Sequence, residues 1–295
     1  MKPAVFSYQS PRTLDEVFGE LAEHGSDARV LAGGQSLIRL MNARTETPGV
    51  LVDINRIPGL DEVTVEDGVV RIGALVRQRT SEVSPVIREH TPVFSEAGAE
   101  VAHVSVRERG TVVGSIAFAD PCAELPTALV ALDGEIVARS TRGERVIPAE
   151  QMFLGPYRTA LAEDEMAVEA RLPALPTGRT GSAFLEITRR HGELPVCGVA
   201  SILRLDDDGQ ITEARISVGA VGDRPQRARA AESALLGRTT DPEVWREAGE
   251  LAAREIEPRP TVHGSSAYRR HLASVVTRRS LSRAAARALE GAHHV

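Results

Sequence analysis

The chain has 295 residues, a net charge of −6 and 42% hydrophobic residues, as in an ordinary globular protein with room for two domains. The negative charge excludes a general basic surface for nucleic acid or anionic membrane, and the 3% aromatic content disfavours a base-stacking platform. Two cysteines without metal-type spacing, no hydrophobic run of membrane-spanning length and no signal-peptide core predict a cytoplasmic protein with neither a disulfide framework nor a membrane span.

The first 75 residues predict a small β-α-β unit followed by a hairpin. Strand patterns cover residues 4–9, a segment that ends at 30–32, and residues 50–54. A helix is expected over 13–25, because Thr13 and Glu16 have capping-box spacing. Residues 61–75 alternate around Asp67-Gly68 as a hairpin does. This order predicts an α+β fold rather than a doubly wound sheet, and no G-x-G-x-x-G follows the first strand.

The middle of the chain divides into a helical part and an irregular part. Residues 76–104 are predicted to be mostly helical, with Pro85 and Pro92 as breaks. Residues 105–126 follow no period and are too apolar for disorder, so we interpret them as a functional loop. Strand patterns follow at 134–138, 144–147 and 165–172.

A proline- and glycine-bearing linker, "LPALPTGRTG" at 172–181, precedes a second predicted α+β domain. Strand patterns lie within 183–190, 196–205 and 211–222, and helices are expected at about 225–236, 241–256 and 265–290. The last helix carries six arginines, interpreted as a solvated basic face, with a docking surface for an acidic partner as the alternative. They are Arg269, Arg270, Arg278, Arg279, Arg283 and Arg287.

Two glycine-bearing segments are candidates for binding phosphate. In "VLAGGQSLI" (30–38), Gly33 and Gly34 leave a bare backbone between an expected strand and an expected helix, and Ser36 is a suitable N-cap. The alternative is a tight turn that binds nothing. In the second segment, Gly110 and Gly114 bracket a β-branched run.

Together the two segments could clamp a pyrophosphate through backbone amides and the hydroxyls of Ser36, Thr111 and Ser115. Neither segment contains Lys or Arg, so the clamp is predicted to rely on neutral donors. No phosphate-loop lysine motif occurs, which argues against an ordinary nucleoside triphosphatase.

The remaining candidates for chemistry are few. Asp120 and Glu124 suggest an acid–base pair or a metal site, with the capping of a turn and a helix as the alternative. His103 and His191 are isolated in the sequence and without metal-ligand spacing. Cys122 is either a reactive thiol or a small buried residue. From residues alone, the chain is a two-domain α+β protein that could bind a phosphorylated cofactor.

The motifs "AGGQSL" (32–37) and "GTVVGSIAFADPCAELP" (110–126) resemble those of the flavoprotein medium subunit of molybdenum hydroxylases, the xanthine dehydrogenase and aerobic carbon monoxide dehydrogenase group. The resemblance extends to residues 153–173 and 184–200 and so covers nearly the whole chain. It implies a two-subdomain FAD-binding domain of the vanillyl-alcohol oxidase type over residues 1–173, with subdomains at about 1–58 and 59–173. A smaller C-terminal α+β domain would cover 181–290.

The resemblance also implies the site. The FAD pyrophosphate would lie on residues 32–36 and 111–115, and FAD would be bound non-covalently, because Gln35 stands in the variable slot. No residue is assigned to catalysis or to a metal. The implied cofactor-binding residues are Ala32, Gly33, Gly34, Gln35, Ser36, Leu37, Thr111, Val112, Val113, Gly114, Ser115, Ala119, Asp120, Glu124, Leu161, Glu186 and Leu194.

The implied function is electron transfer in a three-subunit complex. Electrons from a molybdenum centre on a large subunit would pass through [2Fe-2S] clusters on a small subunit to FAD on this chain, and then to an external electron acceptor. One alternative is a free-standing FAD-dependent oxidase or dehydrogenase that acts directly on a small molecule, and another is a flavin-less scaffold. Neither the substrate of the complex nor its acceptor can be read from this chain.

Two residues depart from the family pattern. Val113 stands where relatives usually have glycine, which would cost energy if the position needs a positive φ. Leu194, in "GELP" (192–195), stands where relatives usually have an aromatic residue against the flavin. Val113 therefore raises the question whether the second glycine segment follows the path usual in the family. Leu194 raises the question of which side chain covers the flavin ring.

Overall fold

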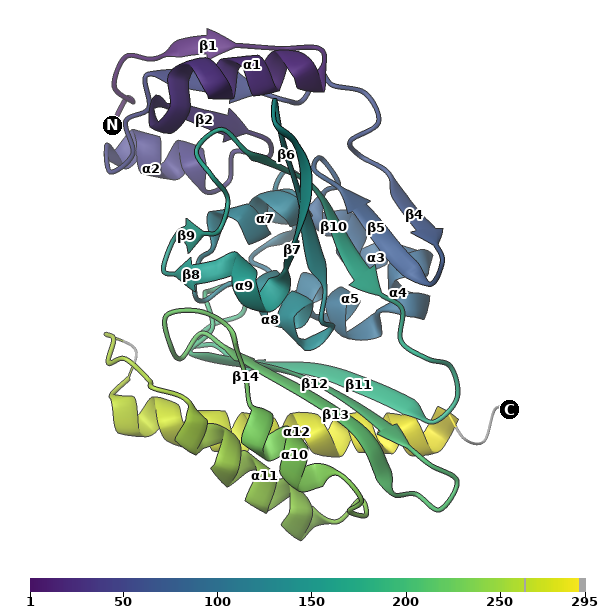
Figure 1. Cartoon of the computed structure of the whole chain (residues 1–295). Coiled ribbons are helices and arrows are strands. Elements are labelled where there is room, and N and C mark those ends of the chain that lie inside the picture. Colours follow the sequence, from purple (N-terminus) through teal and green to yellow (C-terminus); the bar gives the residue numbers. More distant parts are fainter. Residues whose placement is uncertain (263, 292–295) are drawn as a thin grey trace.

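A computed structural model describes residues 1–262 and 264–291 (Figure 1). The chain begins with a three-stranded parallel sheet of order β1-β3-β2. Its elements are β1 (Ser7–Gln9), α1 (Leu14–His24), the 3₁₀ helix η1 (Gly25–Asp27), β2 (Ala28–Leu31), α2 (Leu37–Ala43) and β3 (Val50–Asp53). Thr13 Oγ1 accepts a hydrogen bond from the Glu16 amide, as the capping-box spacing predicts, while the Glu16 carboxylate accepts from the amide of Arg12. The first strand is three residues shorter than predicted.

A five-stranded antiparallel sheet of order β4-β5-β10-β6-β7 follows. Its strands are β4 (Val63–Glu66), β5 (Val69–Gly73), β6 (Glu135–Ser140), β7 (Gly143–Pro148) and β10 (Met166–Pro173). Asp67 and Gly68 connect β4 to β5 with φ of 50° and 73°, the left-handed conformation that a two-residue hairpin turn requires. One face of this sheet buries Ile136 against the helical layer, and the other buries Val137 against the first sheet.

Short helices cover that first face, with α4 and α7 packed on β5 and α7 also on β10. The elements of this layer are α3 (Gln78–Val83), α4 (Pro85–His90), α5 (Pro92–Glu100), α6 (Val104–Arg107), α7 (Val112–Phe118) and α8 (Glu124–Ala131), followed by α9 (Ala149–Met152), β8 (Phe153–Gly155) and β9 (Arg158–Thr159). The interpretation of 105–126 as an irregular loop is therefore wrong. Its helices are too short to show a period, and short connections that contain Gly110 and Pro121 separate them.

The C-terminal part is a four-stranded antiparallel sheet of order β11-β12-β13-β14 with three helices. These elements are β11 (Thr180–Ile187), β12 (Cys197–Leu205), β13 (Ile211–Gly219), β14 (Gln226–Arg227), α10 (Arg229–Leu235), α11 (Pro242–Glu255) and α12 (Ser266–Gly291). The helix expected from 225 starts at Arg229, because residues 226–227 pair with β13 instead.

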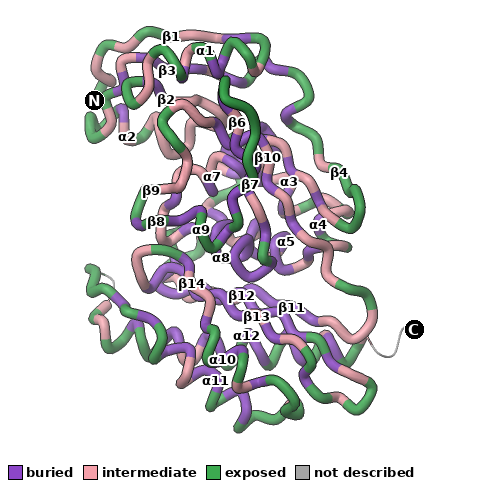
Figure 2. Tube along the Cα trace, viewed as in Figure 1, coloured by how far each residue is buried: buried purple, intermediate pink, exposed green. Residues whose placement is uncertain are grey.

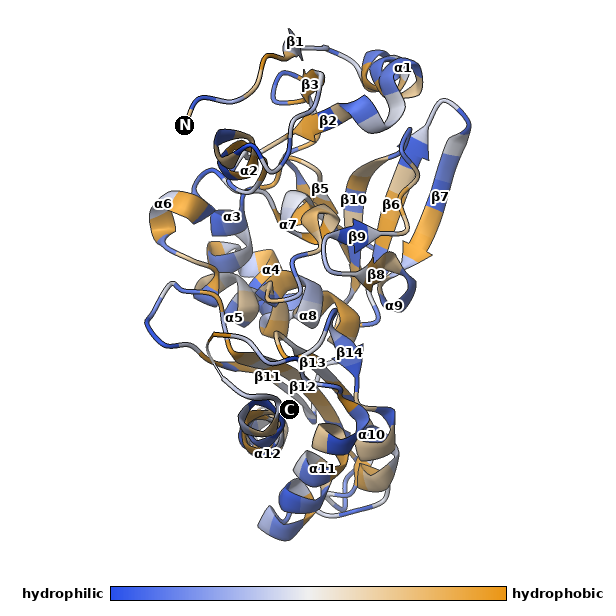
Figure 3. Cartoon of the chain, turned by 90° about the vertical axis from the view of Figure 1, so that its left-hand side faces the viewer, coloured by the Kyte–Doolittle hydropathy of each residue, from blue (hydrophilic) through white to orange (hydrophobic). Residues whose placement is uncertain are grey.

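The C-terminal sheet is buried on both faces, as the run of buried positions in Figure 2 shows. Ala183 and Leu203 join the core beneath α10–α12, whereas Phe184 and Ala200 join the core of the preceding helical layer. Helix α11 completes the outer layer, burying Trp245 and presenting its hydrophilic residues outward (Figure 3). The sheet is thus the shared wall of the two parts of the molecule.

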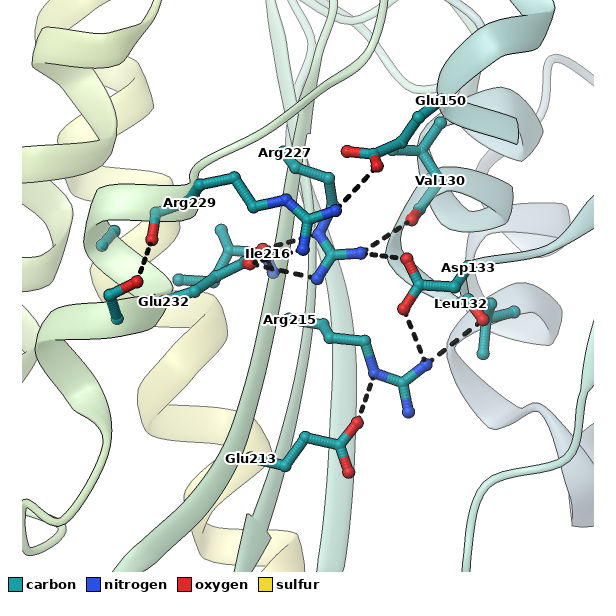
Figure 4. Close-up of polar contacts among 12 residues, drawn as sticks. Val130, Leu132, Asp133, Glu150, Glu213, Arg215, Ile216, Arg227, Arg229 and Glu232 are labelled. Carbon is teal, nitrogen blue, oxygen red and sulfur yellow. Dashed lines mark hydrogen bonds and ion pairs between the residues drawn. The ribbon is translucent and has the colours of Figure 1, made fainter. Parts of the chain in front are cut away.

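A charge network at this wall surrounds Arg227, whose side chain is 3% exposed (Figure 4). Its guanidinium donates to Glu232 at 2.6 Å and pairs with Asp133, which lies in the turn after α8. Arg215 bonds the Leu132 carbonyl at 3.2 Å and pairs with Asp133 at 3.6 Å. Each buried charge therefore has a partner, as a stable interior requires.

The predicted basic face of α12 is only partly solvated. Arg269 is buried and donates to the carbonyls of Ala220 and Arg259, because it closes the loop that follows β13. Arg287 bonds the carbonyl of Ser182 and pairs with Glu96 of α5. The other four arginines are exposed. No helix in residues 1–262 or 264–291 has the length and hydropathy needed to cross a bilayer.

Candidate functional site: a pocket between two glycine segments

The first glycine segment joins β2 to α2. Gly34 has a φ of 71°, which glycine adopts without strain. Ser36 is the residue before α2, but its backbone is already helical and its side chain makes no capping hydrogen bond, so the prediction that its hydroxyl caps α2 is wrong. Leu37 is the first residue of the helix. The hydroxyl of Ser36 is therefore not used by the helix.

The second glycine segment leads into α7. Thr111 Oγ1 accepts a hydrogen bond from the Gly114 amide and caps this helix, and the Ser115 amide bonds the Thr111 carbonyl. Val113 lies inside α7, is buried and does not have a positive φ. Valine at this position therefore carries no backbone strain and packs into the core beside Val112.

The two segments touch through their main chains. A Cβ added to Gly33 would overlap the carbonyl oxygen of Arg109 and lie 2.7 Å from the Cα of Gly110. Only glycine allows this approach. Residues about eighty positions apart in the sequence thus form a single surface, as their paired glycines predict.

This surface carries unused hydrogen-bond donors. Within the described residues, six backbone amides in residues 33–36 and 111–115 have no acceptor: those of Gly33, Gly34, Gln35, Ser36, Thr111 and Val113. Amide groups inside folded proteins are nearly always paired with protein, water or ligand. Several free amides on one surface are the donor set that binds a phosphate or pyrophosphate.

A pocket of about 640 Å³ lies against this surface. Ala32, Gly33, Gly34 and Gln35 line it, together with residues that the sequence did not single out: Leu31, Ile38, Asn55, Arg77, Glu108 and Arg109. Two of these, Arg77 and Arg109, are cations, so the pocket is not lined by neutral groups alone. That the clamp itself relies on neutral donors stays a prediction. Arg109 directly precedes the second motif, whereas Arg77 lies between the two motifs in the sequence. Folding brings Arg77 to the pocket from the segment that follows the β4–β5 hairpin.

Asp120 and Ala119 follow α7. Ala119 adopts a left-handed conformation, with φ of 52°, and its carbonyl accepts from the Tyr157 amide at 2.9 Å. Asp120 accepts from the Cys122 amide at 2.9 Å, which is the turn-capping role, and burial raises the pKa of its carboxyl. Burial, followed by the charge of Asp120, raises the pKa of the Cys122 thiol to about 11, so this thiol is neutral at pH 7 and unreactive.

Two carboxyls, of the buried Glu124 and the half-buried Glu186, lie at the wall between the two parts of the chain. Glu124 opens α8 and is 5% exposed, and burial is the main cause that raises its pKa to about 7. Glu186 lies on β11, and burial, together with the charges of Glu124 and Glu100, raises its pKa to about 9. Its Oε2 has no hydrogen-bond partner among the described residues. Glu186 is therefore protonated at pH 7, with an unused polar atom.

Of the predicted residues, Ala32, Gly33, Gly34 and Gln35 line the pocket, whereas Ser36, Leu37, residues 111–115 and the predicted residues from Ala119 onward are not in its lining. Leu161 is half-buried and packs on the core of the helical layer. Leu194 is 58% exposed in the loop between β11 and β12. That loop contacts the first part of the chain, since Gly192 lies against His103 and the rings of His103 and His191 are 6.5 Å apart. These histidines, isolated in the sequence, are neighbours in space.

Comparison with known proteins defines the class. Residues 4–175 match the family described as the FAD binding domain in molybdopterin dehydrogenase, and residues 182–284 match the CO dehydrogenase flavoprotein C-terminal domain. The chain belongs to this family of FAD-binding medium subunits of molybdenum hydroxylases, and it is an FAD-dependent oxidoreductase subunit with an α+β fold of two parts.

Particular relatives match along the whole chain. The 6-hydroxypseudooxynicotine dehydrogenase complex subunit alpha of Paenarthrobacter nicotinovorans is 40% identical over 98% of this chain and 97% of its own length. The solved structure of carbon monoxide dehydrogenase from Hydrogenophaga pseudoflava aligns with a TM-score of 0.94 at 36% identity, covering 97% of this chain and 99% of that one. Quinoline 2-oxidoreductase from Pseudomonas putida 86 aligns with a TM-score of 0.93 at 35% identity, covering 98% and 100%.

Proposed function

We propose that this chain is the electron-transfer subunit of a molybdenum hydroxylase complex, in which it receives electrons from the [2Fe-2S] clusters of a small subunit and passes them to an external acceptor. Relatives are named as medium chains or subunits of such dehydrogenases. The single observation that supports the site is the meeting of two glycine segments whose six amides have no acceptor in the described chain. When bound, FAD would supply the redox chemistry.

The residues of this chain would hold FAD in three ways. Residues 32–36 and 111–115 would receive the pyrophosphate on their free amides, with Leu37, at the start of α2, beside them. Ala119, Asp120 and Glu124 would contact polar groups of the cofactor, and Leu161, Glu186 and Leu194 would lie near the flavin ring. A protonated Glu186 is suited to donate a hydrogen bond to a carbonyl or nitrogen of that ring. We assign the FAD-binding domain to residues 1–173, with subdomains at about 1–58 and 59–173, and the C-terminal domain to 181–290.

FAD would be bound without a covalent link, because position 35 is Gln and the nearby Cys122 thiol is neutral. Acid or heat denaturation should therefore release all flavin into the supernatant. Flavin that stays with the precipitated chain would contradict this.

The complex is tested by purifying the tagged chain from its own cells. We expect two further subunits, bound molybdenum, and the electron paramagnetic resonance signals of reduced [2Fe-2S] clusters. A yellow chain without partners that is reduced directly by a small molecule would indicate a free-standing oxidase or dehydrogenase. A colourless chain that FAD cannot turn yellow would indicate a scaffold. A cytoplasmic location stays a prediction.

A further inference from the structure

Three side chains at the pocket join the two glycine segments; we call Asp53, Asn55 and Arg77 the polar latch. Arg77 belongs to the second segment by its main chain, because the Gln78 amide bonds the Gly110 carbonyl at 2.8 Å and the Val112 amide bonds the Val76 carbonyl at 2.9 Å. Its guanidinium donates to the Arg109 carbonyl at 2.7 Å and to Asn55 Oδ1 at 3.0 Å.

Asn55 continues the latch to the first segment. Its Nδ2 donates to the Ala32 carbonyl at 2.8 Å and to Asp53 Oδ1 at 2.7 Å. Asp53 in turn accepts from the Tyr8 hydroxyl at 2.5 Å and from the Asn55 amide at 2.9 Å. Burial alone would raise the pKa of Asp53, but these hydrogen bonds outweigh it and hold the pKa below its usual range. An ionised Asp53 therefore fixes which end of the Asn55 amide faces Arg77.

The latch holds the two carbonyls on which the geometry of the glycine segments depends. In a trans peptide the carbonyl and the following N–H point in opposite directions. Holding the Ala32 carbonyl on Asn55 therefore directs the Gly33 N–H away from the latch, and this amide is one of the six without an acceptor. The Arg109 carbonyl, held by Arg77, is the atom that lies closest to the missing side chain of Gly33.

We propose that Arg77 and Asn55 are positioning residues for the pyrophosphate of FAD: they hold the carbonyls of Ala32 and Arg109, and so set the spacing of the two glycine segments and the direction of their free amides. This inference rests on the proposed function. The other role open to Arg77 is a plain positive charge for the phosphates, since its side chain lines the pocket. The two roles differ in whether the forked guanidinium is needed or any cation suffices.

The test compares variants of the flavin-free full chain by calorimetric titration with FAD and with ADP, which shares the pyrophosphate but lacks the flavin ring. Arg77→Met and Arg77→Lys should both weaken binding about tenfold or more, because each loses the two directed hydrogen bonds. The factor should be the same for FAD and ADP. Asn55→Ala should have a similar effect with the charge of Arg77 intact.

Arg109→Met is the matched control. It removes a cation from the same pocket, but the latch uses only the main-chain carbonyl of Arg109, and the guanidinium has no partner among the described residues. Because this change removes only a Coulombic attraction, we expect the affinity for FAD and ADP to fall at most about threefold. The double variant of Arg77→Met and Asn55→Ala should lose about as much as the worse single variant, because the two act through one chain of bonds.

Native affinity in Arg77→Lys, an equal loss in Arg109→Met, or additive losses in the double variant would each overturn the positioning role while leaving FAD binding established. If Arg77→Met does not fold, as judged by circular dichroism, the outcome for Asn55→Ala decides the question. A wild-type chain that binds neither FAD nor ADP would overturn the proposed function and this inference with it.

Discussion

At the wall around Asp133, each arginine that enters the interior meets a carboxylate or a carbonyl, whereas the two glycine segments leave six amide donors without an acceptor among the described residues. The first region resembles the interior of any stable protein, where burying a charge without a partner is too costly. In the second, the missing partners have to come from solvent or ligand. The polar groups that hold the two parts of the molecule together are therefore paired within the chain, whereas those proposed to bind the cofactor are not.

The largest effect is expected in the pocket, from Gly33→Val. The new side chain would collide with the main chain of Arg109 and Gly110 and separate the two segments. We expect FAD affinity to fall at least about 100-fold, with flavin absorbance lost from the purified chain. Gly19→Val, on α1 with open space around it, is the control and should keep its flavin. Full flavin content in Gly33→Val would mean that the cofactor binds elsewhere.

The next effect is expected at the wall. Glu232→Leu leaves the buried Arg227 with Asp133 and the Val130 carbonyl, and removes the acceptor of the Ile216 amide. The free energy of unfolding, from urea denaturation, should fall by about 3 kcal/mol while FAD affinity of the folded chain stays unchanged. The exposed pair of Glu243 and Arg246 on α11 offers the control, and Glu243→Gln should not shift the urea midpoint. A loss of FAD affinity in Glu232→Leu would show that the two regions are not separable.

Glu186 belongs to neither class, because it is half-buried and its Oε2 is a buried atom without a hydrogen-bond partner among the described residues. Its raised pKa means that the native state keeps a proton that the unfolded chain releases above the ordinary carboxyl range, so stability falls as pH rises toward 9. Glu186→Gln should remove this decline and gain about 1 to 2 kcal/mol on wild type between pH 6 and pH 8. Glu23→Gln, an exposed change of the same charge, is the control. If the free energy of unfolding of wild type and of Glu186→Gln changes in parallel with pH, the proposed proton on Glu186 is contradicted.

The smallest effect concerns Leu194, which is more than half exposed. If its loop covers the flavin, Leu194→Tyr adds an aromatic contact of about 0.5–1.5 kcal/mol, which is up to about tenfold in FAD affinity. Reoxidation of the reduced flavin by oxygen should become slower, as measured by stopped flow after photoreduction. Leu236→Tyr, another exposed position, is the control. Unchanged affinity and reoxidation would remove Leu194 from the site.

The sequence predicts best where a local rule decides the structure. Asp67-Gly68 can only form a tight turn, and Thr13 caps α1 whatever lies around it. The paired glycine segments are visible because a close approach of two backbones excludes side chains. The interpretation of residues 105–126 as an irregular loop is wrong because α6 and α7 are only four and seven residues long, too short to show a helical period in the sequence.

What could not be predicted depends on distant partners. Asn55 and Arg77 lie between the motifs and join them only once the first two sheets are in place. Arg269 and Arg287 look like solvent-facing charges on a helical wheel, yet Arg269 donates to a carbonyl in the loop after β13 and Arg287 to a carbonyl of β11. Nothing in the local sequence distinguishes these side chains, because the fold brings their partners to them from distant parts of the chain.

The contact of Gly33 with residues 109–110 also constrains how this chain can evolve. Because the obstacle at position 33 is main chain, no exchange of side chains at 109 or 110 can make room for a larger residue there. A second substitution at 109 or 110 should therefore not rescue a larger residue at 33, and we expect selection to keep glycine there. The guanidinium of Arg109 has no partner among the described residues, so other side chains should be tolerated at this position. In a saturation-mutagenesis survey, position 33 should therefore tolerate the fewest substitutions and position 109 many, although the two residues are in contact.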